Sequence, residues 1–164
     1  MAFDISAIQK GRSTKIPRTT IFGPAGCGKT TFGASAPSPI FIQTEDGLGN
    51  IDAAHFPLAK TFDDVLSAIS TLYTEDHEFR TVVIDSLDWL EPLMWQEVCA
   101  TNKVESIERL PYGRGYTEAL SVWRTFLDGV TALRDKGMWV VMIAHNQVVK
   151  VEDPVTASYD SHTL

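Results

Sequence analysis

The stretch that decides the fold is Gly23-Pro24-Ala25-Gly26-Cys27-Gly28-Lys29-Thr30, which matches the pattern G-x-x-x-x-G-K-[ST] in full. A β-prone run, Thr19 to Phe22, precedes it, and apolar residues with the spacing of a short helix follow it until Pro37. Strand, glycine-rich loop and helix in this order form the context in which the pattern is specific. The stretch therefore predicts a loop that cradles phosphates at the start of a helix.

The residues of this loop have different roles in binding a nucleotide. Glycine lets the backbone wrap closely around an anion, so that consecutive N–H groups face the phosphates. Lys29 would bridge the β- and γ-phosphates, and the Thr30 hydroxyl would bind Mg²⁺. We take residues Gly23 to Thr31 as the nucleotide-binding segment, in which Cys27 is a small loop filler at a variable position of the pattern.

Two carboxylates complete the expected chemistry. Thr81-Val82-Val83-Ile84-Asp85 is a continuous β-branched run, typical of a strand covered on both faces in a parallel sheet. Asp85, at its end, would hold Mg²⁺ through water. Hydrolysis also needs a carboxylate that activates the attacking water, and Glu45 follows another expected strand, residues 39–43. Asp46 is the alternative catalytic acid.

A third group of polar residues follows the last buried strand, Trp139 to Ala144. His145, Asn146 and Gln147 emerge together there, at the edge of the sheet where open α/β folds bind ligands. His145 or Asn146 could sense the γ-phosphate, and we count His145 with Lys29 and Glu45 as a catalytic residue.

The order of expected elements predicts an α/β fold with a mainly parallel, three-layer arrangement, because strands alternate with helices along most of the chain. Thr61 and Asp64 form a capping box before one helix, and Gly137 ends a long one. Residues 102–115 read as a loop or insertion. The tail after Lys150 has no helix stop, so we expect the last strands of the sheet to be missing from this chain.

Length and charge limit the possible functions. The 164 residues allow one domain, which we place at 19–164 after an N-terminal segment, 1–18. The net charge of −7 is the opposite of the broad basic surface of most nucleic-acid binders, so any DNA contact must be local. The longest apolar run, Met138 to Ala144, is too short to cross a membrane, and two cysteines form no disulfide framework. We expect a cytoplasmic protein without a membrane partner.

With these residues in place, the sequence resembles the RecA-like ATPase core, and within it the phage-encoded ATP-binding proteins of the single-strand annealing group. The segments that carry the resemblance span nearly the whole chain and are FGPAGCGKTTF, IFIQTEDGLGNID, TVVIDSLDWLE, YGRGY at 112–116, ALSVWRTFLDGVTALRD and VVMIAHNQVVKVEDPVTASYD. The first is shared by many families. YGRGY followed by AHNQ and EDP is much more particular.

The resemblance implies an ATP- and Mg²⁺-dependent hydrolase of phage recombination that acts in the host cytoplasm. In it, Lys29 and Thr30 bind phosphate and metal, Asp85 is the acidic metal partner, Glu45 the catalytic glutamate and His145 the sensor. It further implies that the protein binds single-stranded DNA, promotes strand annealing and assembles into a homo-oligomeric ring or filament, with a single-strand binding protein as a further partner. The DNA-binding loops are expected partly beyond residue 150.

Other P-loop classes fit less well. A GTPase needs a glycine three residues after the metal-binding aspartate, where this chain has Asp88. A small-molecule or nucleotide kinase remains open and would need an arginine-rich lid, for which Arg109 and Arg114 are the candidates. A nucleotide-binding interaction module that hydrolyses slowly or not at all is the other alternative.

Overall fold

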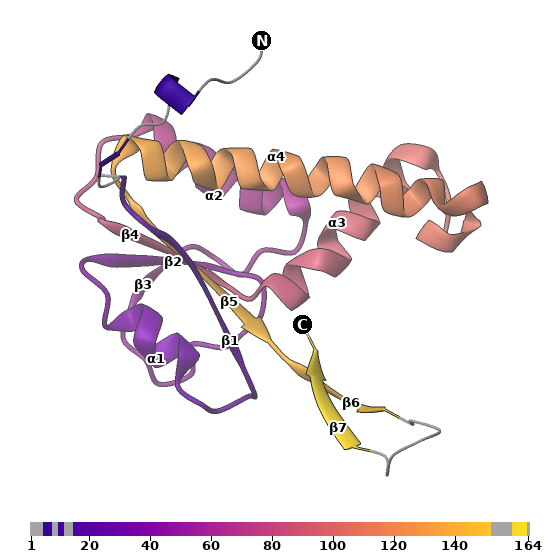
Figure 1. Ribbon diagram of the computed structural model, residues 1–164, viewed down its shortest axis with the longest axis horizontal. Helices are drawn as coiled ribbons and strands as arrows, with labels where there is room; N and C mark the ends of the chain where they lie inside the picture. Colours follow the sequence, from indigo (N-terminus) through magenta and orange to yellow (C-terminus); the bar gives the residue numbers. More distant parts are fainter. Residues whose placement is uncertain (1–4, 8–9, 12–14, 152–158, 164) are drawn as a thin grey trace.

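A five-stranded parallel sheet forms the centre of the molecule (Figure 1). The computed structural model describes residues 5–7, 10–11, 15–151 and 159–163. The strand order is β1-β5-β4-β2-β3, and the strands are β1 (Arg18–Gly23), β2 (Pro39–Gln43), β3 (Ala54–His55), β4 (Thr81–Asp85) and β5 (Trp139–His145). All neighbouring pairs in this sheet run parallel, which confirms the α/β class expected from the sequence.

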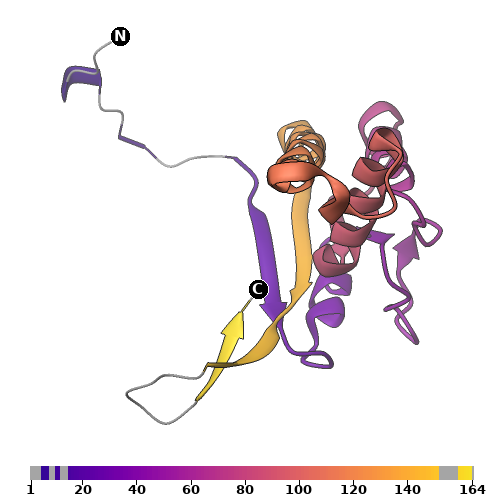
Figure 2. The ribbon, with the colours of Figure 1, turned by 90° about the vertical axis from the view of Figure 1, so that its right-hand side faces the viewer.

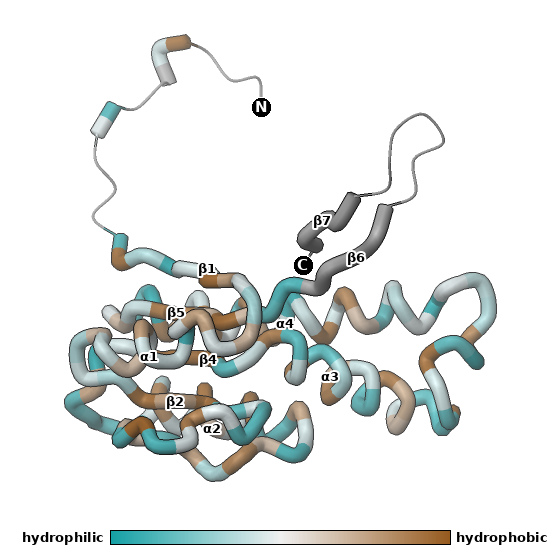
Figure 3. The backbone as a smooth tube through the Cα atoms, turned by 90° about the horizontal axis from the view of Figure 1, so that it is seen from below, coloured by the Kyte–Doolittle hydropathy of each residue, from teal (hydrophilic) through white to brown (hydrophobic). Residues whose placement is uncertain are grey.

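Helices cover both faces of the sheet, as the alternation of elements predicts. One face packs against α2 (Phe62–Thr74), α3 (Leu87–Asn102) and α4 (Arg114–Lys136), and the other against the short α1 (Lys29–Ala34) and the loop after β2 (Figure 2). Successive strand residues point to opposite faces, so Val82 and Ile84 enter the first core layer while Val83 enters the second. The central strands are accordingly apolar in Figure 3.

Local signals in the sequence account for the helix ends. Asp64 N–H donates to Thr61 Oγ1 at 3.1 Å, and Thr61 N–H donates to Asp64 Oδ2 at 2.9 Å, so the predicted capping box starts α2. Gly137 ends α4 with φ 115°, a conformation that side chains rarely tolerate. Both predictions are confirmed.

The connection between α3 and α4 is more regular than the expected loop over residues 102–115. The last residue of α3 is Asn102, α4 already begins at Arg114, and two 3₁₀ turns, Ile107–Arg109 and Pro111–Gly113, lie between them. A Cβ on Gly115 would lie 2.5 Å from the Ile107 carbonyl oxygen. Glycine therefore lets the first turn of α4 press against this connection.

The chain leaves the sheet after β5. An antiparallel pair, β6 (Gln147–Val151) and β7 (Tyr159–Thr163), starts two residues after His145 and forms a sheet of its own. The residues that join the pair, part of the tail singled out in the sequence, lie outside the described residues. No helix within the described ranges is long and apolar enough to cross a membrane.

The strand order places the sequence motifs at one edge. The carboxyl ends of parallel strands meet on the same side of a sheet, and β5 lies between the strand before the glycine-rich loop and the strand that ends in Asp85. The Asn146 N–H donates to the Gly23 carbonyl at 3.4 Å across this edge. The residues after β1, β2, β4 and β5 therefore surround one site.

Candidate nucleotide-binding site

The glycine-rich loop has the conformation that its sequence requires. Gly26 and Gly28 have φ values of 77° and 90°, which an L side chain rarely adopts. The Lys29 ammonium turns back into the loop and donates to the carbonyl oxygens of Gly23 and Pro24, both at 2.9 Å. Lys29 is only 6% exposed. The loop therefore encloses the Lys29 ammonium, which would bind phosphate oxygens in place of these carbonyls when a nucleotide is present.

The two residues expected at the metal meet directly. Thr30 Oγ1 donates to Asp85 Oδ2 at 2.8 Å, although the two are far apart in the chain. Asp85 is 3% exposed, and burial raises the pKa of its carboxyl group, an effect that the Thr30 hydrogen bond opposes and nearby Glu45 reinforces. A hydroxyl and a buried carboxylate are ligands that Mg²⁺ prefers, and a cation would balance that charge. The donor set thus fits magnesium.

Hydrogen bonds between the ends of β2 and β4 fix the position of Glu45. The Thr44 hydroxyl donates to the Ser86 carbonyl at 2.6 Å and accepts from the Ser86 N–H at 2.8 Å. The Thr44 N–H donates to the Asp85 carbonyl at 2.8 Å. Because Thr44 and Ser86 are both buried, these bonds are shielded from water and hold Glu45 beside Asp85.

A cavity of 270 Å³ opens over these groups, and its walls combine the loop with the ends of β2 and β5. Lys29, Glu45 and His145 all line it. The full lining is Gly26, Gly28, Lys29, Thr30, Thr31, Glu45, Gly47 and His145. Asp46 is exposed and is not part of this lining, so the geometry favours Glu45 over Asp46 as the acid that faces a bound phosphate.

Asp88, to which no sequence motif assigns a site role, lies in direct contact with His145. Asp88 accepts from the His145 N–H at 2.7 Å, and its other oxygen lies 2.8 Å from the His145 ring nitrogen Nδ1. The only signal in the sequence was an acidic residue two positions after Ser86, in the first turn of a helix that starts at the sheet edge. Such residues are common, because carboxylates favour helix N-termini for structural reasons alone.

Other candidate residues lie apart from the cavity. Arg109 and Arg114, the possible kinase lid, belong to the connection before α4 and to its first turn, and Arg114 pairs with Glu118 at 2.6 Å. Neither lines the cavity. The Cys27 thiol is exposed in the loop, 4.0 Å from the Lys29 ammonium.

Fold and site together define the class of this protein. In the parallel sheet, β5 lies between β1, which precedes the glycine-rich loop, and β4, which ends in Asp85. Thr30 of the loop contacts Asp85 directly. This arrangement is that of a P-loop NTPase. A protein-family model described as "AAA domain" matches residues 15–163, and the chain belongs to this family. The family indicates nucleotide binding or hydrolysis as its general activity. No curated protein matches the chain.

Proposed function

We propose that this protein binds Mg²⁺-ATP and hydrolyses it. The observation that carries the proposal is the convergence of Lys29, the Thr30–Asp85 pair, Glu45 and His145 around one cavity. Each of these groups has a distinct task in phosphoryl transfer, which depends mainly on positioning and on charge stabilisation.

In the proposed mechanism, the amides of the glycine-rich loop and the Lys29 ammonium bind the β- and γ-phosphates. Thr30 and Asp85 would hold a magnesium ion, which would supply positive charge to the phosphate oxygens. Glu45 orients the attacking water toward the γ-phosphorus and accepts a proton from this water. His145, at the end of β5, lies beside the γ-phosphate and distinguishes ATP from ADP.

We further propose that ATP turnover serves single-stranded DNA binding and strand annealing. The resemblance to phage-encoded annealing proteins motivates this step, with a homo-oligomer as the active form, the host cytoplasm as its place and a single-strand binding protein as a partner. The position of β6 supports this function, because the strand starts two residues after His145 and would move with any displacement of His145 at the γ-phosphate. The net charge of −7 requires the DNA contacts to be local.

The kinase alternative finds less support in the site. Lys29 is the only lysine or arginine among the described residues that line the cavity, whereas a kinase needs a cationic lid over the transferred phosphoryl group. The interaction-module alternative differs from the proposal only in turnover, which an assay measures directly.

The test is ATPase activity with single-stranded DNA, double-stranded DNA and no DNA, for the parent protein and for Lys29→Ala. We expect Mg²⁺-dependent turnover that single-stranded DNA raises, and no turnover in the variant. Lys103→Ala is the matched control, because this exposed lysine lies at the end of α3. Turnover at the parent rate in Lys29→Ala would refute the site. Activity that ignores DNA would refute the annealing function while leaving the ATPase intact.

A further inference from the structure

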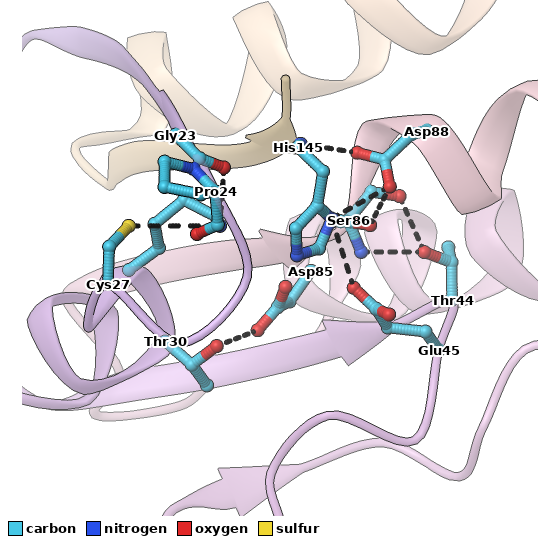
Figure 4. A network of polar contacts seen from close by, with 11 residues as sticks. Gly23, Pro24, Cys27, Thr30, Thr44, Glu45, Asp85, Ser86, Asp88 and His145 are labelled. Carbon is cyan, nitrogen blue, oxygen red and sulfur yellow. Dashed lines mark hydrogen bonds and ion pairs between the residues drawn. The ribbon is translucent and has the colours of Figure 1, made fainter. Parts of the chain in front are cut away.

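Asp88 collects three hydrogen bonds at the point where α3 starts beside the end of β5 (Figure 4). Oδ1 accepts from the His145 backbone N–H at 2.7 Å, and Oδ2 lies 2.8 Å from His145 Nδ1. The Ser86 hydroxyl donates to the same Oδ2 at 3.1 Å. One carboxylate therefore holds both the backbone and the ring of His145, which is more than the N-terminal turn of a helix requires.

The charge of Asp88 defines which nitrogen of His145 carries the proton. Burial raises the pKa of Asp88, but the hydrogen bonds from the His145 backbone and ring outweigh it, so this pKa lies below its ordinary value. An ionised carboxylate only accepts hydrogen bonds, and the ring must therefore donate from Nδ1. Nε2 of a neutral ring is then left as an acceptor, on a side chain that lines the nucleotide cavity.

Glu45 competes for the same ring proton. Its Oε1 lies 3.7 Å from His145 Nδ1, against 2.8 Å for Asp88, so the geometry directs the proton to Asp88. Without Asp88, the nearest carboxylate for this donor would be Glu45, the group proposed to activate water. A carboxylate that accepts a hydrogen bond from His145 is a weaker base toward water.

We propose that Asp88 is a positioning residue of the ATPase, which holds the Nδ1 proton of His145 away from Glu45 and leaves Nε2 as a hydrogen-bond acceptor for the water beside the γ-phosphate. This inference rests on the proposed function. It assigns two effects to one carboxylate: the orientation of the sensor, and the freedom of Glu45 to act on water. Asp88 itself does not line the cavity and so acts through His145.

A double-mutant cycle tests whether Asp88 acts through His145. Asp88→Asn should lower kcat about tenfold or more, because small displacements of catalytic groups cost this much, and should change the Kd for ATP less than about twofold. In a His145→Gln background the same substitution should have almost no further effect, because the positioned group is gone. Effects that multiply independently, or an unchanged kcat in Asp88→Asn, would overturn the proposal.

Asp63→Asn is the matched control. Asp63 occupies the same second position of α2, is exposed, and lies on a different helix from the site, so its loss should leave kcat unchanged. Thermal denaturation of each variant separates misfolding from loss of positioning. A fall in kcat in Asp63→Asn equal to that in Asp88→Asn would assign the effect to helix stability and overturn the proposal.

A measurement without nucleotide separates this proposal from the proposed function. The ¹⁵N spectrum of the imidazole groups should report His145 protonated at Nδ1 in the parent and shifted toward Nε2–H in Asp88→Asn. A parent spectrum with Nε2–H overturns the proposal even if every variant fails to fold. A parent with the Nδ1–H form but no turnover identifies the ATPase assignment as the failing step, and Asp88 then has no catalysis to support.

Discussion

Asp85 and Glu45 are neighbouring carboxylates with different surroundings. Asp85 is buried with one described side-chain donor, the Thr30 hydroxyl, whereas Glu45 is half-buried and lines the cavity. Burial penalises the charge on Asp85, and a bound cation would remove that penalty. Glu45 keeps access to water. The two residues should therefore differ in what their amide variants lose.

Asp85→Asn should make the metal-free protein more stable and the nucleotide complex weaker. Removing a penalised charge should raise Tm by about 3 °C, and Mg²⁺-ATP should no longer add the stabilisation that it gives the parent. Calorimetry with and without Mg²⁺-ATP measures both effects. A lower Tm without metal would mean that the Thr30 contact outweighs the cost of burial.

Glu45→Gln should keep nucleotide affinity and lose turnover. An amide cannot accept the proton of the attacking water, so kcat should fall about 10²- to 10⁴-fold while the Kd for ATP stays within about twofold. Titration of a fluorescent nucleotide and a phosphate-release assay provide the two quantities. Asp46→Asn is the control, because Asp46 is exposed outside the cavity lining, and a larger loss in this variant would transfer the role to it.

At the scale of elements, α1 stands out because it has only six residues and carries the phosphate site at its start. A Cβ on Gly33 would lie 2.9 Å from a methyl group of Val83 and 3.3 Å from the Phe41 ring, so glycine is what allows α1 to approach the sheet. The depth of this contact sets the position of Lys29 and Thr30 relative to Asp85.

Gly33→Val should push α1 away from the sheet. Overpacking of this kind costs about 1–3 kcal/mol of folding free energy, and the displaced Thr30 should also weaken Mg²⁺-ATP binding beyond the loss of stability. Chemical denaturation and nucleotide titration measure the two effects. Gly11→Val is the control, because a Cβ there meets nothing within 4 Å. Unchanged affinity in a destabilised Gly33→Val would show that α1 can shift without moving the site.

The helices and strands were largely predictable from the sequence, but the pairing of distant strands and the contacts between distant residues were not. Apolar runs and capping signals act locally, so β4, the start of α2 and the end of α4 follow from the sequence. The insertion of β5 between β1 and β4 depends on how strands far apart in the chain pair, which no local pattern encodes. Asp88 was missed for the same reason, because its partner His145 lies 57 positions away.

At the scale of the whole molecule, the site is short of positive charge. Phosphoryl transfer gains about 10³- to 10⁵-fold from an added arginine, and Lys29 is the only cation among the described residues of the cavity lining. A neighbouring copy could supply the missing charge if the nucleotide lay at a boundary between subunits, as the RecA-like resemblance implies.

Turnover per subunit should therefore rise with protein concentration. ATP and single-stranded DNA together should shift the protein to larger species in sedimentation. Raising the salt from about 50 to 200 mM should lower the affinity for DNA more than tenfold and so reverse this shift, because DNA contacts are ionic. A strictly monomeric protein, equally active at every concentration and indifferent to DNA, would contradict both the assembly and the annealing function.

The place of β1 in the sheet also has a consequence for the order in which the protein folds. In the described sheet β1 pairs with β5 alone, and Arg18 and Val140 are partners although 122 positions separate them. β2 and β4 pair over a much shorter loop and can form first, because closing long loops is slow. The phosphate-binding loop should thus be completed late, after the barrier to folding. Nucleotide should then slow unfolding and leave the refolding rate unchanged, which stopped-flow kinetics can measure. ATP would thus stabilise the native state without accelerating folding.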